Sequence, residues 1–208
     1  MNQTKLLVHL MIDTSASVEG TKRDAFESAM NNFLEYVANT FHAAALEIAI
    51  TCYDDFEPQR LSAFTTVESK VDLPYERFPL LGRTLFNVLS NVEKRVNELI
   101  IDNQSYYKPW IIILSDGISY DKADDALNKF SSMDFAVKPV MFPFLLSSNK
   151  VNENARTFEH HKHFVEIRDH RYNQMFQWLG DLIKTRLNTP VDQKMTLNKS
   201  QMLEWIKQ

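Results

Sequence analysis

Four short apolar runs, separated by longer amphipathic stretches, constrain the fold of this chain most strongly. The runs are KLLVHLMI (5–12), LEIAITCY (46–53), PWIIILS (109–115) and KPVMFPFLL (138–146). Short runs that are apolar throughout, with no polar alternation, are typical of strands buried on both faces of a sheet. The segment HHKHFVEI (160–167) predicts a further, last strand.

Helical patterns lie between these strands. In 21–41 the apolar residues recur at spacings of three and four, which predicts one apolar stripe along a helix. Similar patterns cover 85–101, 122–133 and 172–187. Strands that alternate with helices predict an α/β fold, a doubly wound and mostly parallel sheet with helices on both faces.

One segment does not fit the parallel pattern. RLSAFTTV (60–67) follows the strand at 46–53 too closely for a crossover helix. It therefore predicts one antiparallel edge strand, paired as a hairpin. Asp54 and Asp55, in the connection, are interpreted as residues that cap this hairpin.

The length and composition favour one domain with a short appendage. The chain has 208 residues, of which 44% are hydrophobic and 24% charged. We expect a domain over 1–187 and a tail over 188–208, where Pro190 ends the helical pattern. The tail carries a short amphipathic helix with Met202, Leu203, Trp205 and Ile206. This helix either folds back on its own domain or docks in a partner's groove.

Charge and cysteine content exclude several classes of function. A formal net charge of −4 and a pI of about 5.9 provide no basic surface for nucleic acid or for acidic membranes. The single cysteine, Cys52, excludes an internal disulfide and favours a reduced, cytoplasmic compartment. The apolar run Leu6–Ile12 is too short for most signal peptides, and no segment is long enough to span a bilayer.

Three loops are predicted to meet at one edge of the sheet. In open α/β sheets, ligands bind beyond the carboxyl ends of the strands. Residues 13–20 follow the first strand, LLGRT places Gly82 and Thr84 immediately before a helix, and LSDG places Asp116 and Gly117 after another strand. Three of the four glycines, Gly20, Gly82 and Gly117, fall in these loops, where tight turns or close backbone approach would need them.

Together the loops offer two carboxylates and three hydroxyls, from Asp13, Ser15, Ser17, Thr84 and Asp116. An all-oxygen set suits Mg²⁺, or alternatively Mn²⁺, and offers nothing soft for zinc or copper. If the carboxylates act through water, the ion remains electrophilic toward an incoming carboxylate. The site would then receive an acidic side chain from another molecule.

The motifs DTSAS, GRT and LSDG, in this order on an alternating α/β pattern, resemble the metal-ion-dependent adhesion site of von Willebrand factor A (VWA) domains. The resemblance covers about residues 5–187, and YYKPWIIILSDG is most similar to the bacterial TerY-like group associated with tellurite resistance and stress response. It implies a Rossmann-like VWA fold and a protein-interaction module rather than an enzyme. Ser15, Ser17 and Thr84 would bind the metal directly, Asp13 and Asp116 would hold its waters, and a partner Glu or Asp would complete the octahedron.

This chain departs from the family pattern at two places. Ala16 and Val18 stand where many relatives have glycine and methionine, which should stiffen the loop without removing an oxygen. Arg83 replaces the second of two frequent glycines before the threonine. A bulky cation beside the metal could block an ordinary partner or select a doubly acidic one.

Several other interpretations remain open. Asp13, Ser15 and Ser17 could simply cap a helix. A metal-dependent phosphohydrolase is an alternative, although Ser15 occupies the position where aspartate-nucleophile phosphatases need a second acid. An adaptor for a MoxR-type ATPase is another alternative, and kinase or phosphatase components of the same system are possible partners.

The histidines suggest a less favoured zinc site. His160, His161 and His163 lie close together with His170 nearby, but no cysteine completes a tetrahedral set. His9, in a central apolar strand, is interpreted as a core histidine. The charge cluster 122–125 is interpreted as the solvated start of a helix.

Overall fold

The structure is a computed structural model that describes residues 3–14, 21–53, 60–61, 80–116, 119, 121–146, 165–168, 170–195, 202 and 205–206. Its strands are β1 (Leu6–Asp13), β2 (Leu46–Tyr53), β3 (Arg60–Leu61), β4 (Trp110–Ser115), β5 (Val140–Leu146) and β6 (Val165–Ile167). Its helices are α1 (Thr21–Thr40), α2 (Leu81–Ile101), α3 (Asp124–Ser132) and α4 (Tyr172–Leu187).

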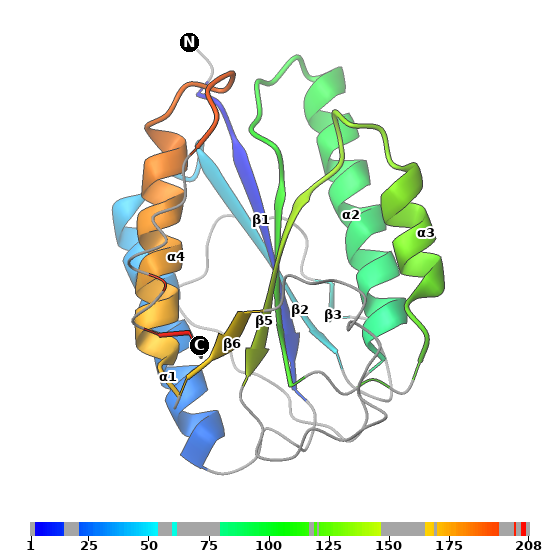
Figure 1. The fold of residues 1–208 in the computed structure, drawn as a ribbon. Coiled ribbons are helices and arrows are strands. Elements are labelled where there is room, and N and C mark those ends of the chain that lie inside the picture. Colours follow the sequence, from blue (N-terminus) through cyan, green and yellow to red (C-terminus); the bar gives the residue numbers. More distant parts are fainter. Residues whose placement is uncertain are drawn as a thin grey trace.

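The strands form one sheet in the order β3-β2-β1-β4-β5-β6. The pairs β1–β2, β1–β4, β4–β5 and β5–β6 are parallel. Figure 1 shows α1 and α4 on one face of this sheet and α2 and α3 on the other. The predicted α/β class, with a parallel sheet covered on both faces, is therefore confirmed.

The edge beyond β2 is described at two residues. Arg60 and Leu61 pair antiparallel with Cys52 and Thr51. The remainder of the predicted edge strand, 62–67, lies outside the described residues, as do Asp54 and Asp55.

Alternate residues of β1 enter opposite halves of the core, because successive side chains of a strand point to opposite faces. Leu6, Val8, Leu10 and Ile12 pack with α1 and α4, whereas Leu7 and Met11 pack with α2 and α3. All six side chains are completely buried. The uninterrupted apolar run of the sequence thus reflects a strand that is covered on both faces.

The described part of the tail packs on the domain. The Trp205 side chain is 1% exposed, and its ring centroid lies 5.6 Å from that of Phe144 and 5.4 Å from that of Trp178. The Trp205 carbonyl accepts a 2.8 Å hydrogen bond from the Arg168 amide, and Ile206 forms an antiparallel bridge with Ile167. Of the two alternatives for the tail, these contacts support folding back. The division of the chain at residue 187 remains a prediction.

Two element boundaries differ from the predictions. Helix α2 begins at Leu81 rather than Leu85, so Gly82 and Thr84 lie within its first turn instead of before it. Helix α3 begins at Asp124 rather than Lys122. The earlier start of α2 has a tertiary cause, because its amide groups are capped by another loop.

Candidate functional site

The site lies where the sheet reverses its direction of winding. From β1 the strand order runs through β2 on one side and through β4 on the other. Ligands in open α/β sheets bind in the crevice beyond the carboxyl ends of strands at such a switch point. Asp13 is the last residue of β1, and Asp116 directly follows β4.

The two strand ends are joined through the Asp13 side chain. Its Oδ2 atom accepts hydrogen bonds from the Ser115 hydroxyl and from the Asp116 amide, both at 3.2 Å. Asp13 is 1% exposed, whereas Asp116 is only partly buried. The structure therefore brings these two predicted site residues together, with one carboxylate fixed and the other nearer to solvent.

The first turn of α2 is fastened to the loop that follows Asp116. The Leu81 amide donates to the Ser119 hydroxyl at 3.1 Å. The amides of Gly82 and Arg83 donate to the two oxygens of Asp121 at 2.9 and 2.7 Å. Leu80 precedes the helix and provides no side-chain cap, so Ser119 and Asp121 satisfy these free helix amides instead.

Gly82 permits this close approach. A Cβ atom at position 82 would lie 2.2 Å from the Lys122 carbonyl oxygen and 2.7 Å from its carbonyl carbon. Both atoms belong to the backbone and cannot rotate away. The glycine predicted to allow close approach is thus the point where α2 meets the loop from β4.

Thr84 is the polar residue of this turn that faces the interior. Its side chain is completely buried, and its Oγ1 atom has no hydrogen-bond partner among the described residues. Leaving such a hydroxyl unsatisfied costs about 1–3 kcal/mol. A buried hydroxyl of this kind requires a partner, which a bound ion, a water molecule or a group outside the described residues would supply.

The residues of the proposed set fit a hard cation. Asp13 and Asp116 supply carboxylates at adjoining strand ends, and the buried Thr84 hydroxyl belongs to the helix fastened to the same loop. Oxygen ligands of this kind suit Mg²⁺ or Mn²⁺. Ser15, Ser17, Gly20 and Gly117 lie outside the described residues.

Sequence reasoning missed three residues that shape the site. Ser115 positions the Asp13 carboxylate, while Ser119 and Asp121 cap α2. A serine and an aspartate in a loop are ordinary capping signals, but the helix that they cap lies 38 or 39 positions away along the chain. No local pattern identifies that pairing.

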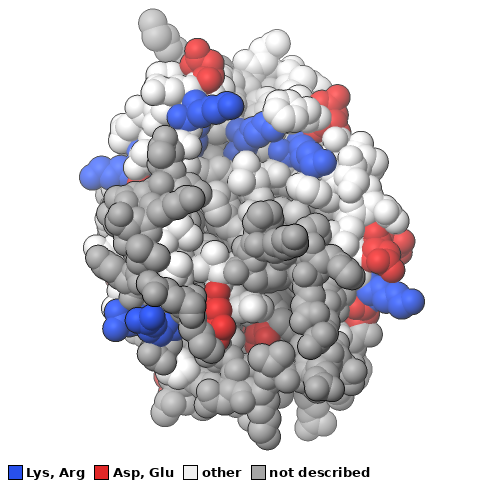
Figure 2. Space-filling view, in the orientation of Figure 1, with Lys and Arg blue, Asp and Glu red and all other residues white. Residues whose placement is uncertain are grey.

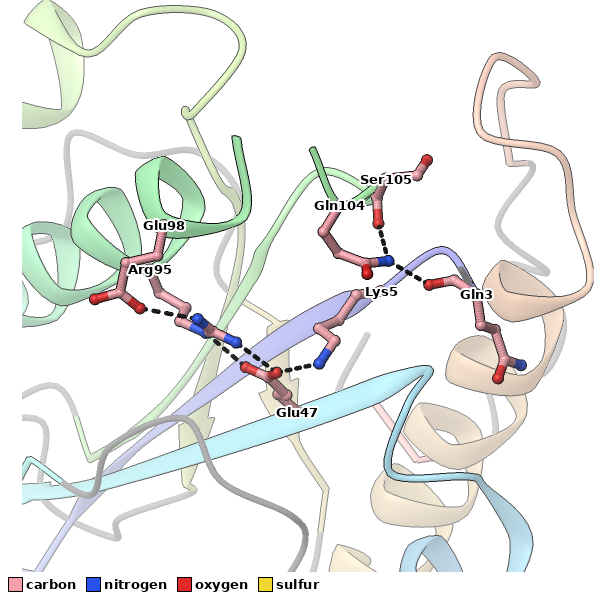
Figure 3. A network of polar contacts seen from close by, with 7 residues as sticks. All are labelled: Gln3, Lys5, Glu47, Arg95, Glu98, Gln104 and Ser105. Carbon is pink, nitrogen blue, oxygen red and sulfur yellow. Dashed lines mark hydrogen bonds and ion pairs between the residues drawn. The ribbon is translucent and has the colours of Figure 1, made fainter. Parts of the chain in front are cut away.

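The opposite end of the sheet carries a partly buried ion-pair network around the buried Glu47, shown in Figure 3. Arg95 donates hydrogen bonds to both oxygens of Glu47 at 2.8 Å and also binds Glu98. Lys5, which directly precedes β1, forms an ion pair with Glu47. Burial raises the pKa of Glu47, but the hydrogen bonds and charges of Arg95 and Lys5 outweigh it and hold that pKa below its usual range. Glu47 is therefore a structural carboxylate, neutralised within the fold.

The histidines divide between the core and the undescribed part of the chain. His9 is completely buried, with its Nε2 atom 2.7 Å from the Thr51 hydroxyl, which confirms the interpretation as a core histidine. His160, His161 and His163 lie outside the described residues, and His170 is exposed. Within the described ranges, no group of three or more His, Cys, Asp or Glu side chains is placed to hold a metal.

Lys122, Asp124 and Asp125 are exposed, as expected for the solvated start of a helix. In the described part of the chain, no helix is long and apolar enough to cross a membrane.

The chain is similar in structure to several proteins whose structures have been solved. The chain resembles the pilus adhesin SpaC from Lactobacillus rhamnosus GG with a TM-score of 0.64 and 8% identity, over 90% of this chain and 31% of the adhesin. It resembles proximal thread matrix protein 1 from the mussel byssus with a TM-score of 0.56 and 12% identity, over 86% of this chain and 48% of that protein. A manganese-loaded TRAP protein from Plasmodium vivax aligns with a TM-score of only 0.44 and 12% identity, over 85% of this chain and 63% of that protein.

No protein-family model matches the sequence, and no curated protein does. The chain spans about a third to a half of the two structures with the higher TM-scores. At these identities the likeness concerns the fold alone, and it supports a VWA-like fold.

Proposed function

We propose that this chain is a Mg²⁺-dependent protein-interaction module that binds an acidic residue of a partner. The buried Thr84 hydroxyl, which has no hydrogen-bond partner among the described residues, is the observation that carries the proposal. It belongs to the helix that is fastened to the loop of Asp116, and the Asp116 amide in turn binds Asp13.

Five residues would hold the ion. Ser15, Ser17 and Thr84 supply hydroxyl ligands, and Asp13 and Asp116 hold coordinated waters. Mn²⁺ is an alternative to Mg²⁺ because both prefer hard oxygen ligands. When bound, the ion supplies a positive centre with an open coordination position for a partner carboxylate.

The chain's own residues prepare this position. Ser115 and the Asp116 amide orient the Asp13 carboxylate, so that it cannot turn away from the edge of the sheet without losing two hydrogen bonds. Ser119 and Asp121 hold the first turn of α2, and with it Thr84, against the same loop. Preorganisation of this kind reduces the cost of ordering the ligands when the ion binds.

The fold supports a binding role rather than catalysis. Of the two similar structures with TM-scores above 0.5, one is a pilus adhesin and the other is a thread matrix protein. We assign no enzymatic activity to the chain. The alternative is a metal-dependent phosphohydrolase. Phosphatase turnover that Asp13→Asn abolishes would establish this alternative.

The cellular context is proposed from the sequence resemblance. The TerY-like similarity favours a cytoplasmic bacterial assembly for stress response or tellurite resistance, with kinase, phosphatase or ATPase components as partners. An adaptor for a MoxR-type ATPase is the alternative within the same class. The buried single cysteine, Cys52, accords with a reduced compartment.

Affinity capture from the source lysate, in Mg²⁺ and in EDTA, tests the proposal. Wild-type protein should retain a partner in Mg²⁺ and release it in EDTA, and Asp13→Asn should not retain it in either buffer. The Asn side chain keeps an oxygen that can accept the bonds from Ser115 and Asp116, so the fold should survive. Partners that are indifferent to EDTA and to Asp13→Asn would contradict the metal-bridged mechanism.

A further inference from the structure

A cleft of about 970 Å³ lies beside the first turn of α2, between this helix and α3. Its walls include Gly82, Arg83 and Phe86 from α2, and Lys122 and Lys129 from the α3 side. Gly82 and Arg83 belong to the same first turn of α2 as Thr84, and Asp121, which also lines the cleft, belongs to the loop that follows Asp116. The cleft is therefore built partly from the elements that carry the candidate metal site.

The charged groups of the cleft differ in how far they are already paired. Asp121 accepts hydrogen bonds from the amides of Gly82 and Arg83 and from the Ser119 hydroxyl. The Lys129 ammonium pairs with Glu93 at 2.7 Å. These two charges are occupied by contacts within the fold, whereas Asp125 is an exposed carboxylate of the cleft wall that an incoming acid has to avoid.

Arg83 and Lys122 are the cations of the cleft that remain for a partner. Both are exposed, and neither forms an ion pair with another described residue. In Figure 2, basic side chains gather near the top of the molecule, while acidic and basic ones alternate on the right, where Figure 1 places α3. The electrostatic field over this face therefore does not have one sign throughout. An acidic group has to be selected by individual cations.

An apolar surface accompanies these cations. Phe86 lies one turn beyond Arg83 on α2 and is 39% exposed, which is high for a large apolar side chain. The Lys129 ammonium lies over one face of its ring, 5.5 Å from the ring centroid. The methylene groups of a glutamate could pack on this ring while its carboxylate reaches a cation.

We propose that this cleft binds a second acidic side chain of the same partner. The partner segment would carry two acids, one for the metal site and one for Arg83 and Lys122, with the stem of the second acid against Phe86. The inference rests on the proposed function, and it deepens that function by specifying a doubly acidic partner. Arg83, which would obstruct a partner without a second acid, becomes the residue that selects the partner.

Fluorescence anisotropy with synthetic peptides tests this inference. The probes are labelled, glycine-rich peptides with one glutamate, or with two glutamates separated by one, two or three glycines, measured in Mg²⁺ at low ionic strength. At least one two-glutamate peptide should bind about fivefold more tightly than the one-glutamate peptide, as for a surface ion pair. Arg83→Gln with Lys122→Gln should remove this gain. The one-glutamate peptide should bind the double variant at least as tightly as it binds the wild type, because Arg83 no longer obstructs it.

Lys94→Gln is the matched control, since Lys94 is an exposed cation of α2 that does not line the cleft. It should preserve the fivefold difference. Equal affinities for one-glutamate and two-glutamate peptides, or a gain that survives the double variant, would overturn the inference. Peptide binding that is unaffected by EDTA would instead overturn the proposed function, and loss of that binding in the double variant would still support the cleft.

Discussion

Thr84 is the residue at which the candidate site can be altered with the smallest change of shape. Thr84→Val replaces a buried hydroxyl, which has no hydrogen-bond partner among the described residues, by a methyl group. Without metal, the variant should be as stable as wild type or about 1 kcal/mol more stable, since an unsatisfied polar group is removed. In Mg²⁺ it should lose most of the stabilisation that metal gives the wild type.

Thermal unfolding in EDTA and in Mg²⁺ measures both effects. Ser90→Ala is a suitable control, because its hydroxyl bonds a carbonyl of its own helix away from the site. If Thr84→Val were strongly destabilised in EDTA, the hydroxyl would have a structural role, and the argument for a ligand would fail.

His9 links the stability of the core to pH. Burial lowers the pKa of His9 from 6.5 to about 3. Above pH 6.5 the histidine is neutral in both the folded and the unfolded protein. As the pH falls from 6.5 toward 3, only the unfolded chain takes up the proton, so the free energy of unfolding decreases by up to about 1.4 kcal/mol per pH unit.

Urea unfolding between pH 7.5 and 5.5 tests this contribution. His9→Gln, which retains a polar group near Thr51, should lose about 1 kcal/mol less stability than wild type over that range. His42→Gln, at an exposed position, should follow the wild type. Identical pH dependence in all three proteins would show that His9 is not held neutral by burial.

At the scale of elements, the contact between α2 and the loop after β4 depends on a missing side chain. Gly82→Ala would bring a Cβ atom within 2.2 Å of the Lys122 carbonyl, so the helix or the loop must shift. We expect a loss of about 1–3 kcal/mol in the free energy of unfolding and a weaker affinity for Mg²⁺. Chemical denaturation and Mg²⁺ titration calorimetry would measure these changes.

Gly180→Ala provides the comparison. A Cβ at position 180 would meet the Tyr36 ring at 2.9 Å, but this is a partly exposed side chain that can move. Since alanine also favours a helix interior by up to about 1 kcal/mol, this variant should be nearly neutral. Equal effects of the two substitutions would contradict a special role for the approach at Gly82.

The elements also show what the sequence could predict. Helix α4 has the predicted bounds, 172–187, because its apolar periodicity is local and continuous. The predicted start of α2 was wrong by four residues, because the groups that cap this helix, Ser119 and Asp121, lie in a distant loop. The contact of Asp13 with the Asp116 amide follows from parallel strands that end at one edge, whereas the buried hydroxyl of Ser115 resembles any other strand residue in the sequence.

At the scale of the whole molecule, the tail belongs to the core through Trp205. Its ring packs against Phe144 and Trp178, so Trp205→Ala should lower the free energy of unfolding by about 3–5 kcal/mol. Trp205→Phe should cost clearly less because it retains an aromatic ring. Chemical denaturation of both variants, and of a chain that lacks residues 190–208, measures these changes in the free energy of unfolding. A truncated chain with unchanged stability would contradict folding back and favour docking on a partner.

The two ends of the sheet provide a built-in comparison for the metal site. The Lys5, Glu47 and Arg95 network lies toward the amino ends of the strands, and the candidate site lies at their carboxyl ends. Eight residues of β1 separate these ends by about 26 Å. A paramagnetic ion bound at one end should therefore affect amide signals there much more strongly.

We propose that a divalent cation binds at the carboxyl ends of β1 and β4 beside α2. Amide NMR spectra recorded during addition of substoichiometric Mn²⁺ test it most directly. We expect selective broadening of the Asp13, Thr84 and Asp116 signals, reversed by excess Mg²⁺, while the signals of Lys5, Glu47 and Arg95 stay unaffected. Uniform broadening, no broadening, or broadening centred on the histidines 160–163 would contradict it.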